Sequence, residues 1–513
     1  MRLSTKHAGQ QVVELKDFSG GLNTSTAEEQ ILPNQLAKSV NFELQAATGL
    51  LKTVDGTRKI YRVPESASYR FKAGAYDLLN KHLVFFADNG TIFSVPLSKN
   101  TDVRQIGRLS NNEEPVTVVW EDGLMIASGG YLQYAAGYQL KTITSSPTKC
   151  KGCYTRDGRV VVFDDDNVTF SAVGDEEGWE DISNDDSSSK FIQPGYKQGG
   201  KIIGLINLSS DMLIIKDNGM LRRLSGSYPD WEDNEVSRGT YCRGKQAYCN
   251  VLNNAYILGR DAIYGVNTTQ EYGDVKAANV AQLVEDNIEN LPEGSKMRFV
   301  PTLKQIWIVT NSPYVLMMDI NTGAFYERQF NAPVYDVIDA DDSVYVVKGD
   351  GYDIIDEDSY IDENAPLDYT LQTKTLISHN EYLLKRVVLG CTGYSNAMHS
   401  IRLTVNDTVK ANCPIQSIYG GLIPVYGNTD YVFRNTEYII NTHGQRVVYN
   451  NKRRYIFNND EFVFSSDEYI IDFDVYSLFD QKLRFRDKAL VTKLSGAGGK
   501  FVLNTIKYDV VEV

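Results

Sequence analysis

Pairs of short apolar strands recur along the first two thirds of the chain. In each pair, an apolar run is followed by a turn rich in Gly, Asn, Asp or Ser and then by a second apolar run. This pattern predicts a β-hairpin. Seven such pairs begin at His82, Leu124, Val160, Met212, Ala255, Ile306 and Val344.

The spacing of these hairpins indicates the fold. Successive starts lie 36 to 52 residues apart, and a period of about 40 to 50 residues made only of strands is typical of a β-propeller with one four-stranded blade per repeat. An upstream strand precedes some hairpins, such as GAYDLL before HLVFF. We therefore predict an all-β chain with a propeller of about seven blades over residues 61–360. A long β-sandwich is the alternative, which the regular period disfavours.

The pattern changes after DEDSYIDENAP at residues 356–366. From Leu367 onward the strands are longer and alternate between apolar and polar residues, which predicts a β-sandwich-like domain over residues 361–513. Residues 1–60 precede the first hairpin, and we interpret them as an N-terminal strap or arm.

Four segments interrupt the strand pattern. LPNQLAKSVNF at residues 32–42 has Pro33 in a first-turn position and apolar residues on one face, which predicts a short helix. Residues 279–291 are the second helix candidate. Residues 174–200 are acidic and rich in serine, which predicts a long exposed loop. GAGG at residues 496–499 lies between two strands, so we expect a hairpin turn there and not a phosphate-binding loop.

Charge restricts the classes of partner. The chain has 513 residues and a net charge of −14, which argues against a nucleic-acid-binding surface spread over the whole protein. A passage through which DNA slides remains compatible with this charge, because Lys and Arg contacts to phosphate would hold the DNA in place. The N-terminus lacks the apolar segment of a signal peptide, and no apolar run reaches the ~18 residues of a transmembrane helix.

The cysteine pattern favours reduced thiols over a zinc site. Cys150 and Cys153 form a CxxC motif in a polar turn. A zinc site would need a second pair, and Cys242 with Cys249 is spaced too widely for that role. The six cysteines, which include Cys391 and Cys413, suit a protein that folds in a reducing cytosol.

No catalytic pattern emerges from the remaining reactive residues. The acidic run Asp164–Asp166 is expected at a solvated hairpin tip, and neither it nor Asp350 with Asp353 matches an EF-hand calcium loop. His82 is expected at the start of a strand. The histidines form no metal-binding motif, and they are His7, His82, His379, His399 and His443. We therefore predict no enzyme activity, no cofactor and no metal.

The N-terminal strap resembles the start of bacteriophage tail proteins. The resemblance rests on GGLN at residues 20–23, LPNQLAKSVNFEL at 32–44 and GLLKTVDGTRKIY at 49–61. In the tail nozzle, tail hub and packaged-DNA stabilisation proteins of short-tailed phages, a similar segment leads into a propeller. One departure is Thr53-Val54-Asp55, where a basic residue is common. The matching residues are Gly20, Gly21, Asn23, Pro33, Gln35, Asn41, Gly49 and Gly56.

Two later segments also resemble this family. The blade-like stretch that starts at VTFSAVGDEEGWED (168–181) and continues through residues 201–226 is similar to propeller blades of these proteins. The C-terminal SGAGGKFVLNTIKYDVVEV (495–513) resembles a closing strand pair common in such virion proteins.

The resemblance implies a structural role in the virion tail. Proteins of this family assemble as about six copies around the tail axis, below the portal and adaptor, and are made in the host cytoplasm. They line the conduit, help to retain packaged DNA and channel it on ejection without sequence-specific binding. The expected partners are therefore further copies of the chain, portal or adaptor proteins, other tail or fibre proteins, and passing double-stranded DNA. Gly20 and Gly21 would permit a backbone geometry that straps the N-terminus onto the propeller or a neighbouring subunit.

Two other functions compete with this one. A receptor- or glycan-binding tail tip could use exposed aromatic residues, for which Trp179 and Trp231 are the candidates. A propeller glycosidase that acts on host polysaccharide would need two carboxylates roughly 5–10 Å apart, and no such pair stands out among the 66 acidic residues.

Overall fold

The structure is a computed structural model that describes residues 10–45, 48–268, 275–393, 399–415, 423–424, 431–432, 438–440, 446–450, 453–457 and 475–512. These residues are mostly in β-strands, which confirms the predicted all-β class. They form two compact units. Unit 1 combines Met1–Gly56 with Glu357–Val513, and unit 2 comprises Thr57–Asp356.

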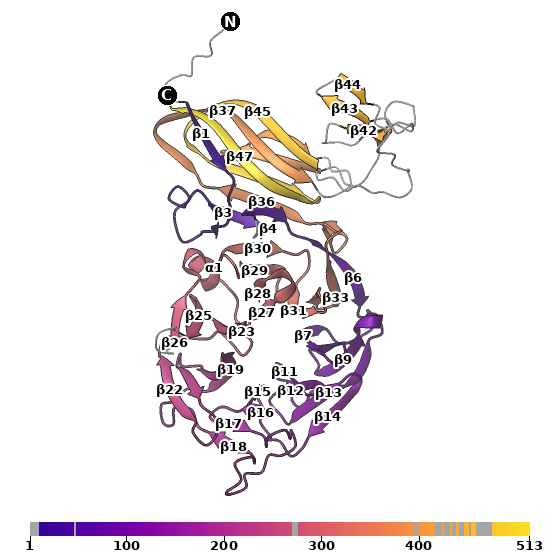
Figure 1. The fold of residues 1–513 in the computed structure, drawn as a ribbon, viewed down its shortest axis with the longest axis vertical. Helices are drawn as coiled ribbons and strands as arrows, with labels where there is room; N and C mark the ends of the chain where they lie inside the picture. The colour runs from indigo at the N-terminus through magenta and orange to yellow at the C-terminus, as the bar shows by residue number, and fades with distance from the viewer. Residues whose placement is uncertain are drawn as a thin grey trace. The chain divides into compact units, whose positions relative to one another are not determined.

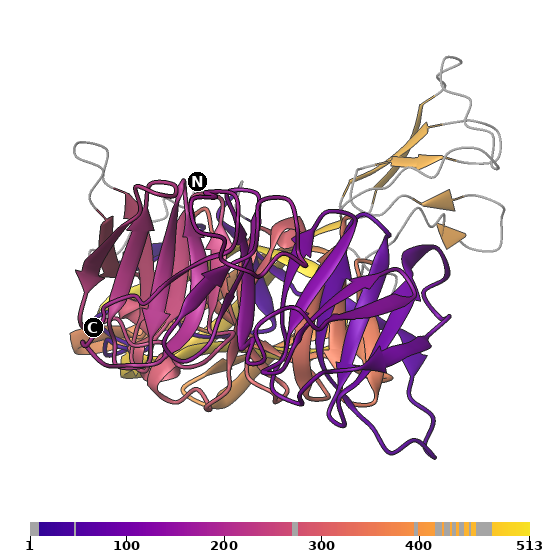
Figure 2. The same cartoon turned by 90° about the horizontal axis from the view of Figure 1, so that it is seen from below.

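The strands of unit 2 form antiparallel groups of four, most of which are separate four-stranded sheets (Figures 1 and 2). In chain order, the first group comprises β7(Phe71–Asp77), β8(His82–Ala87), β9(Thr91–Pro96) and β10(Arg104–Arg108), and the second comprises β11(Val116–Trp120), β12(Gly123–Ala127), β13(Leu132–Ala136) and β14(Gln139–Ile143). The third comprises β15(Gly152–Arg156), β16(Arg159–Phe163), β17(Val168–Phe170) and β18(Lys190–Ile192). The fourth comprises β19(Ile202–Leu208), β20(Asp211–Lys216), β21(Leu221–Ser225) and β22(Glu232–Ser237).

Three further groups of four strands complete the described part of unit 2. The fifth comprises β23(Tyr248–Val251), β24(Asn254–Leu258), β25(Ile263–Thr268) and β26(Val275–Asn279). The sixth comprises β27(Lys296–Val300), β28(Gln305–Val309), β29(Tyr314–Asp319) and β30(Phe325–Gln329). The seventh comprises β31(Val334–Ala340), β32(Ser343–Lys348), β33(Gly351–Asp356) and β6(Gly56–Arg62). We refer to these seven groups as sheets 1 to 7.

The seven predicted hairpins are confirmed, and each forms the second and third strands of one sheet. In the first, Phe85 pairs with Phe93, and Gly90 in the turn has φ +80°, a conformation that favours glycine. The predicted upstream strands are present as β7 and β19. Turn chemistry and apolar alternation were therefore sufficient to locate these strands.

Neighbouring sheets of unit 2 pack through their apolar faces. The first strands of sheets 2 to 7 contact one another in sequence order, and β31 of sheet 7 contacts β7 of sheet 1 (Figure 1). Sheets 1 and 2 share a core that includes Ala73 and Ile126. Sheets 7 and 1 share another, in which the rings of Tyr352 and Phe85 stack with centroids 4.3 Å apart.

Sheet 7 differs from the others because its strands come from both ends of unit 2. Strands β31, β32 and β33 end the unit, whereas β6 begins it and pairs with β33. The amide of Val63 donates to the carbonyl of Asp350 at 2.7 Å, and the Arg62 guanidinium lies 2.5 Å from the carboxylate of Asp353. The first strand of unit 2 is thus held by the last.

The helix predicted at residues 32–42 is wrong, because this segment forms strand β3(Gln35–Val40). The backbone of β3 pairs with β2(Gly21–Leu22) on one side and with β36(Asp368–Thr373) on the other. These non-local ladders override a local helical pattern. The helix candidate at residues 279–291 is confirmed by the 3₁₀ turn η2(Gln282–Val284) and the helix α1(Glu285–Glu289).

The long loop predicted at residues 174–200 is interrupted by β18, which is the fourth strand of sheet 3. The backbone of β18 pairs with β17, and the Lys190 side chain is buried. A shorter loop, residues 171–189, connects β17 to β18.

Unit 1 is built from two main sheets that draw on both ends of the chain. One has the strand order β4(Phe42–Gln45), β5(Leu50–Thr53), β47(Phe501–Glu512), β37(Leu376–Gly393) and β45(Val475–Leu490), with β1(Gln10–Leu15) also on β47. The other has the order β2, β3, β36, β46(Thr492–Ala497), β38(His399–Val405) and β39(Thr408–Ile415).

The core of unit 1 lies between these two sheets. The ring of Phe42 meets the rings of Tyr369 and Phe501 edge-on, with centroids 5.7 and 5.9 Å away. A smaller sheet contains strands β40(Ile423–Pro424), β41(Tyr431–Val432), β42(Tyr438–Ile440), β43(Arg446–Asn450) and β44(Arg453–Phe457).

The glycine run at residues 496–499 is not a hairpin turn. It connects β46 to β47, which belong to different main sheets of unit 1. Gly498 and Gly499 both have positive φ values, +68° and +82°, so this turn uses glycine to pass from one sheet to the other.

Within the described ranges, no helix has both the length and the apolar character that crossing a membrane requires.

Candidate functional site

The N-terminal strap residues form a hydrogen-bonded cluster inside unit 1. Gly21 has φ +62° and pairs in parallel with Gln35. The buried Asn23 side chain donates to Gln35 Oε1 at 2.9 Å, and the amide of Leu32 donates to the same oxygen at 2.8 Å. A Cβ on Gly20 would approach the side chain of Gln35 to 2.8 Å. The two glycines therefore allow this part of the strap to fold back on itself.

The later strap residues attach to C-terminal strands. Asn41 is buried with φ +59°, and its side chain donates to the carbonyl of Asp368 at 2.6 Å. The amide of Gly56 donates to the carbonyl of Ser359 at 2.7 Å. A Cβ on Gly56 would lie 2.6 Å from the backbone of Ile361, so only glycine fits there.

Gly49 stabilises the turn that precedes β5. It has φ +70°, and its carbonyl accepts a hydrogen bond from the amide of Phe18 at 2.8 Å. Pro33 is exposed in the turn before β3. The residues singled out by their resemblance to phage proteins thus all lie in unit 1, where seven of them support the strap and Pro33 lies at its surface. Their role in assembly between subunits stays a prediction.

A second cluster, which sequence reasoning missed, joins the first strands of several sheets in unit 2. The fully buried carboxylate of Asp336 on β31 binds the Arg298 guanidinium of β27 through two bonds, at 2.8 and 3.1 Å. Asp336 also accepts from the amide of Gly74 on β7 at 3.1 Å. Arg298 in turn donates to the side chain of Gln246.

Two more ion pairs extend this axial cluster toward the loop before sheet 2. Lys296 lies 2.9 Å from Glu114 and also donates to the carbonyl of Lys72 at 2.8 Å. Lys245 pairs with Glu113. Beside these residues lies a cavity of about 270 Å³, whose lining includes Gly74, Thr117, Lys245, Gln246, Tyr248 and Arg298.

The axial cluster is suited to holding sheets together. Each cation in it has a carboxylate partner, and desolvated ion pairs are costly to break on one side only. The sequence did contain a signal for it, because Arg298 and Asp336 interrupt otherwise apolar inner strands, KMRFV and VYDVI. Periodicity alone could not show that these charges meet.

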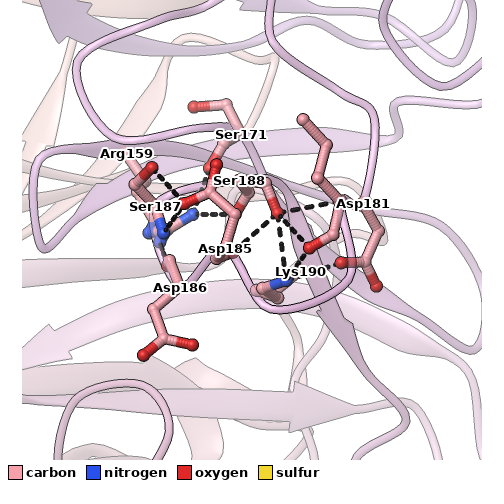
Figure 3. Close-up of polar contacts among 9 residues, drawn as sticks. Arg159, Ser171, Asp181, Asp185, Asp186, Ser187, Ser188 and Lys190 are labelled. Atoms are coloured by element: carbon pink, nitrogen blue, oxygen red, sulfur yellow. Dashed lines mark hydrogen bonds and ion pairs between the residues drawn. The ribbon is translucent and has the colours of Figure 1, made fainter.

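The acidic loop 171–189 is held from beneath by two buried cations (Figure 3). Arg159 donates to the carbonyls of Ser171 and Ser188 at 2.7 and 2.6 Å and to that of Asp186 at 2.5 Å. Lys190 lies 2.5 Å from the carboxylate of Asp181. Hydrogen bonds from Ser187 hold the pKa of Asp185 below its usual range. The loop is therefore an ordered surface.

The other carboxylates considered from sequence have structural partners. Asp164 accepts hydrogen bonds from the amides of Asp166 and Asn167 at 2.8 and 2.7 Å, which confirms the predicted hairpin tip. Asp353 lies 2.8 Å from the fully buried Lys348 ammonium, and Asp350 lies 3.6 Å from Arg62. These contacts give each of these acids a partner within the protein.

The CxxC cysteines lie in the core shared by sheets 2 and 3. The thiol of Cys150 donates to the carbonyl of Pro147 at 3.1 Å, and that of Cys153 to Val116 at 3.2 Å. Burial raises the pKa of Cys150 to about 12, so its thiol stays protonated near neutral pH. Cys242 and Cys249 are also free thiols.

His82 begins strand β8, as the sequence predicts. Its Nδ1 lies 2.8 Å from the hydroxyl of Ser94. His7 and His443 lie outside the described residues, while His379 and His399 lie in β37 and β38.

The two tryptophans considered for sugar stacking contact the protein core instead. Trp179 packs against the core shared by sheets 2 and 3 and donates to the carbonyl of Glu176 at 2.6 Å. Trp231 packs against Phe170 with ring centroids 4.3 Å apart. Both tryptophans are half-buried.

Comparison with known proteins gives no assignment for the chain: no family model matches it, and no curated protein matches it.

Proposed function

We propose that this chain is a non-enzymatic structural component of a short-tailed bacteriophage tail, a nozzle or hub protein that forms part of the DNA conduit. In this proposal unit 2 is a seven-bladed β-propeller and unit 1 is a β-sandwich-like module that carries the strap. The protein would be made in the host cytoplasm and incorporated into the virion tail.

The propeller is supported by the number and connection of the sheets in unit 2. Each has four antiparallel strands, and β31 of sheet 7 contacts β7 of sheet 1. Strand β6, from the start of the unit, completes sheet 7 by pairing with β33. A last blade made from both ends of the repeat region can close a ring of blades, because the pairing of β6 with β33 joins the start of the unit to its end.

One observation carries the tail assignment. The two segments that most resemble phage tail proteins, the N-terminal strap and the C-terminal strand pair, are 400 residues or more apart in sequence yet belong to one unit. Leu51 of β5 pairs with Leu503 of β47, and Val13 of β1 pairs with Tyr508. The resemblance at the two ends of the chain thus falls in one compact unit, which suits an element that acts in assembly.

The proposed role suits a closed ring of identical subunits with an acidic net charge. About six copies around the tail axis would repeat one interface, and rigid β-units would give the ring a stiff wall. The net charge of −14 keeps general phosphate binding weak, which suits DNA that must move. The portal or adaptor above, and other tail or fibre proteins, would be the partners.

The first test is quantitative mass spectrometry of gradient-purified particles from the phage that encodes this chain. We expect about six or twelve copies per particle relative to the major capsid protein, as closed rings require. A much higher multiple would indicate peripheral fibres and favour receptor binding. Absence of the chain from the particles would overturn the proposal.

A further inference from the structure

The loops of unit 2 leave the sheets at two opposite ends. Because the strands of each sheet are antiparallel, the turn between its second and third strands and the linker to the next sheet emerge at the same end. We call this the linker end (Figure 2 shows the strands of unit 2 from the side). Contacts between sheets 4 and 5 agree, since Asn207 near the end of β19 bonds Asn250 near the end of β23, so both first strands run the same way.

Three consecutive linkers at this end are basic, although the chain is acidic overall. They join sheets 2 to 3, 3 to 4 and 4 to 5, and occupy residues 144–151, 193–201 and 238–247. None of the three contains Asp or Glu. Their cations are Lys149, Lys151, Lys197, Lys201, Arg238, Arg243 and Lys245.

Ion pairs and hydrogen bonds bring the first two linkers together. Lys151 and Lys201, from different linkers, lie 2.6 and 3.8 Å from the carboxylate of Asp165. The amide of Lys201 donates to Asp217 at 2.8 Å. The first two linkers therefore meet at the hairpin turns of sheets 3 and 4.

Exposed tyrosines interleave with the cations. Tyr241 of the third linker packs over Gly219, where an added Cβ would lie 3.0 Å from the ring. The Arg260 guanidinium stands over the ring of Tyr241 at 5.4 Å. In the second linker, Lys197 stands 5.1 Å from the ring centre of Tyr196, which is 67% exposed.

Three cations at the linker end are available for a ligand, two from the linkers and one from the hairpin turn of sheet 5. Lys149, Lys197 and Arg260 are exposed, and among the residues that the structure describes none has a carboxylate within ion-pair distance. Two nearby acids already have partners within the protein: Asp164 accepts a hydrogen bond from its own turn, and Asp165 forms an ion pair with Lys151. Asp166, Asp217 and Asp261 are exposed on the same end and keep the net positive charge small.

Cations interleaved with aromatic rings match a nucleic acid better than a simple anion. Lys and Arg neutralise phosphates, and Tyr rings provide stacking surfaces that accept any base. An aliphatic anion would use only the cations. Because few phosphates are contacted and exposed acids lie nearby, binding should be weak and readily reversed by salt.

We propose that the linker end of sheets 3 to 5 in unit 2 is a weak, sequence-independent contact surface for the phosphate backbone of DNA. This deepens the proposed function by naming the surface that faces the DNA, and it rests on that function for its biological setting. Single- and double-stranded DNA share the phosphate backbone that the cations would contact. Stacking on the tyrosines favours single strands, whose bases are accessible.

The test is fluorescence anisotropy of the full chain with labelled single- and double-stranded oligonucleotides of mixed sequence over a range of salt concentrations. With about three phosphates contacted, we expect a slope of log affinity against log salt near −2 for single strands and near −3 for duplex. The combined variant Lys149→Gln, Lys197→Gln and Arg260→Gln should bind about tenfold more weakly, or worse, at low salt and lose most of the slope.

Matched controls separate this surface from general charge effects. Lys81→Gln, Lys99→Gln and Lys304→Gln remove three exposed cations from the opposite end of the sheets and should leave binding unchanged. Tyr196→Ala with Tyr241→Ala should weaken single-strand binding about fivefold or more while duplex binding changes less. Circular dichroism of each variant establishes that the fold is retained.

Three results would overturn the inference: no binding to either form of DNA at low salt, equal loss in the control variant, or equal binding to dextran sulfate, which carries charge without bases. Each differs from failure of the tail proposal, which is decided by mass spectrometry of particles. A chain found in the tail that does not bind DNA would remove only this surface.

Discussion

Units 1 and 2 are made of similar strands but are assembled in different ways. In unit 2, apart from β6 with β33, paired strands follow one another in sequence and are joined by short turns. In unit 1, β1 and β5 from the N-terminal part pair with β47 at the C-terminal end. Unit 2 can therefore form sheet by sheet, whereas unit 1 needs both ends of the chain.

This difference predicts different sensitivities to change. Local hairpins lose little entropy on closure, while pairing over hundreds of residues requires a large loop to be closed first. Unit 1 should thus depend on single non-local contacts of the strap. In unit 2 the corresponding weak point is sheet 7, where the two ends of the unit meet.

Deletion of residues 1–45 should have the largest effect. It removes β1 to β4 and, among the buried apolar side chains, those of Phe18, Leu22, Leu36 and Phe42, each of which is at most 1% exposed. At about 1.5–3 kcal/mol for each buried side chain, the loss is about 6–12 kcal/mol, comparable with the stability of a whole domain.

We expect unit 1 to unfold in this deletion variant and unit 2 to persist. Hydrogen exchange measures both outcomes, with the amides of β37 reporting on unit 1 and those of β20 on unit 2. Amides of β37 that stay protected would show that the strap is dispensable for unit 1, and loss of protection in β20 would show that the units are not independent.

Asp353→Asn tests the closing sheet of unit 2. The carboxylate of Asp353 is fully buried between the Lys348 ammonium and the Arg62 guanidinium. Removing one partner of a buried pair costs about 3–5 kcal/mol, so the free energy of unfolding of unit 2 should fall by about that amount.

The matched control is Asp350→Asn, because this exposed carboxylate lies 3.6 Å from the same Arg62 and an exposed pair contributes at most about 1 kcal/mol. Urea denaturation followed by tryptophan fluorescence measures both changes. Equal effects of the two substitutions would contradict a special role for the buried pair.

The sequence located the parts of unit 2 well because its information is local. A turn such as Asp88-Asn89-Gly90 and the apolar runs around it define one hairpin without reference to distant residues. Residues 32–42 misled for the opposite reason: the helical spacing is local, but the partners of Gln35 and Leu36 are β2 and β36, which no short window contains.

The candidate sites divide in the same way. Gly21, Gly49 and Asn41 were all selected by resemblance, and the structure shows that all three have positive φ. Nothing in the sequence indicated that the partner of Asn41 is the carbonyl of Asp368. The ion pair between Arg298 and Asp336 and the basic linkers at 144–151, 193–201 and 238–247 needed the arrangement of sheets, because side chains far apart in sequence become neighbours only there.

Asn41→Ala examines a single contact of the strap. Asn41 has φ +59° and its side chain bonds the carbonyl of Asp368 at 2.6 Å. Alanine loses this hydrogen bond, about 1 kcal/mol, and is strained in the left-handed region by about 1–2 kcal/mol. We expect unit 1 to lose about 2–3 kcal/mol.

Asn41→Gly separates the two contributions, because glycine accepts the backbone conformation but cannot form the bond. It should cost about 1 kcal/mol. Chemical denaturation monitored by exchange of β36 and β37 amides measures the difference. A glycine variant as unstable as the alanine variant would mean that backbone strain at this position is unimportant.

The smallest effect is expected from protonation of His82 in unit 2. Burial lowers the pKa of this imidazole below its usual value, and nearby Asp77 only partly opposes the shift. The unfolded chain therefore binds a proton at a higher pH than the folded chain does. Stability from this group is fully present above the unfolded pKa of about 6.5 and is lost as pH falls from there toward the folded pKa.

His82→Gln should remove this dependence, so the difference in the free energy of unfolding between the parent and the variant should be constant above pH 7 and shift in favour of the variant between about pH 6.5 and 5. Thermal denaturation of both proteins across this range measures the difference. A difference that stays constant down to pH 5 would show that folding of unit 2 does not lower the pKa of His82.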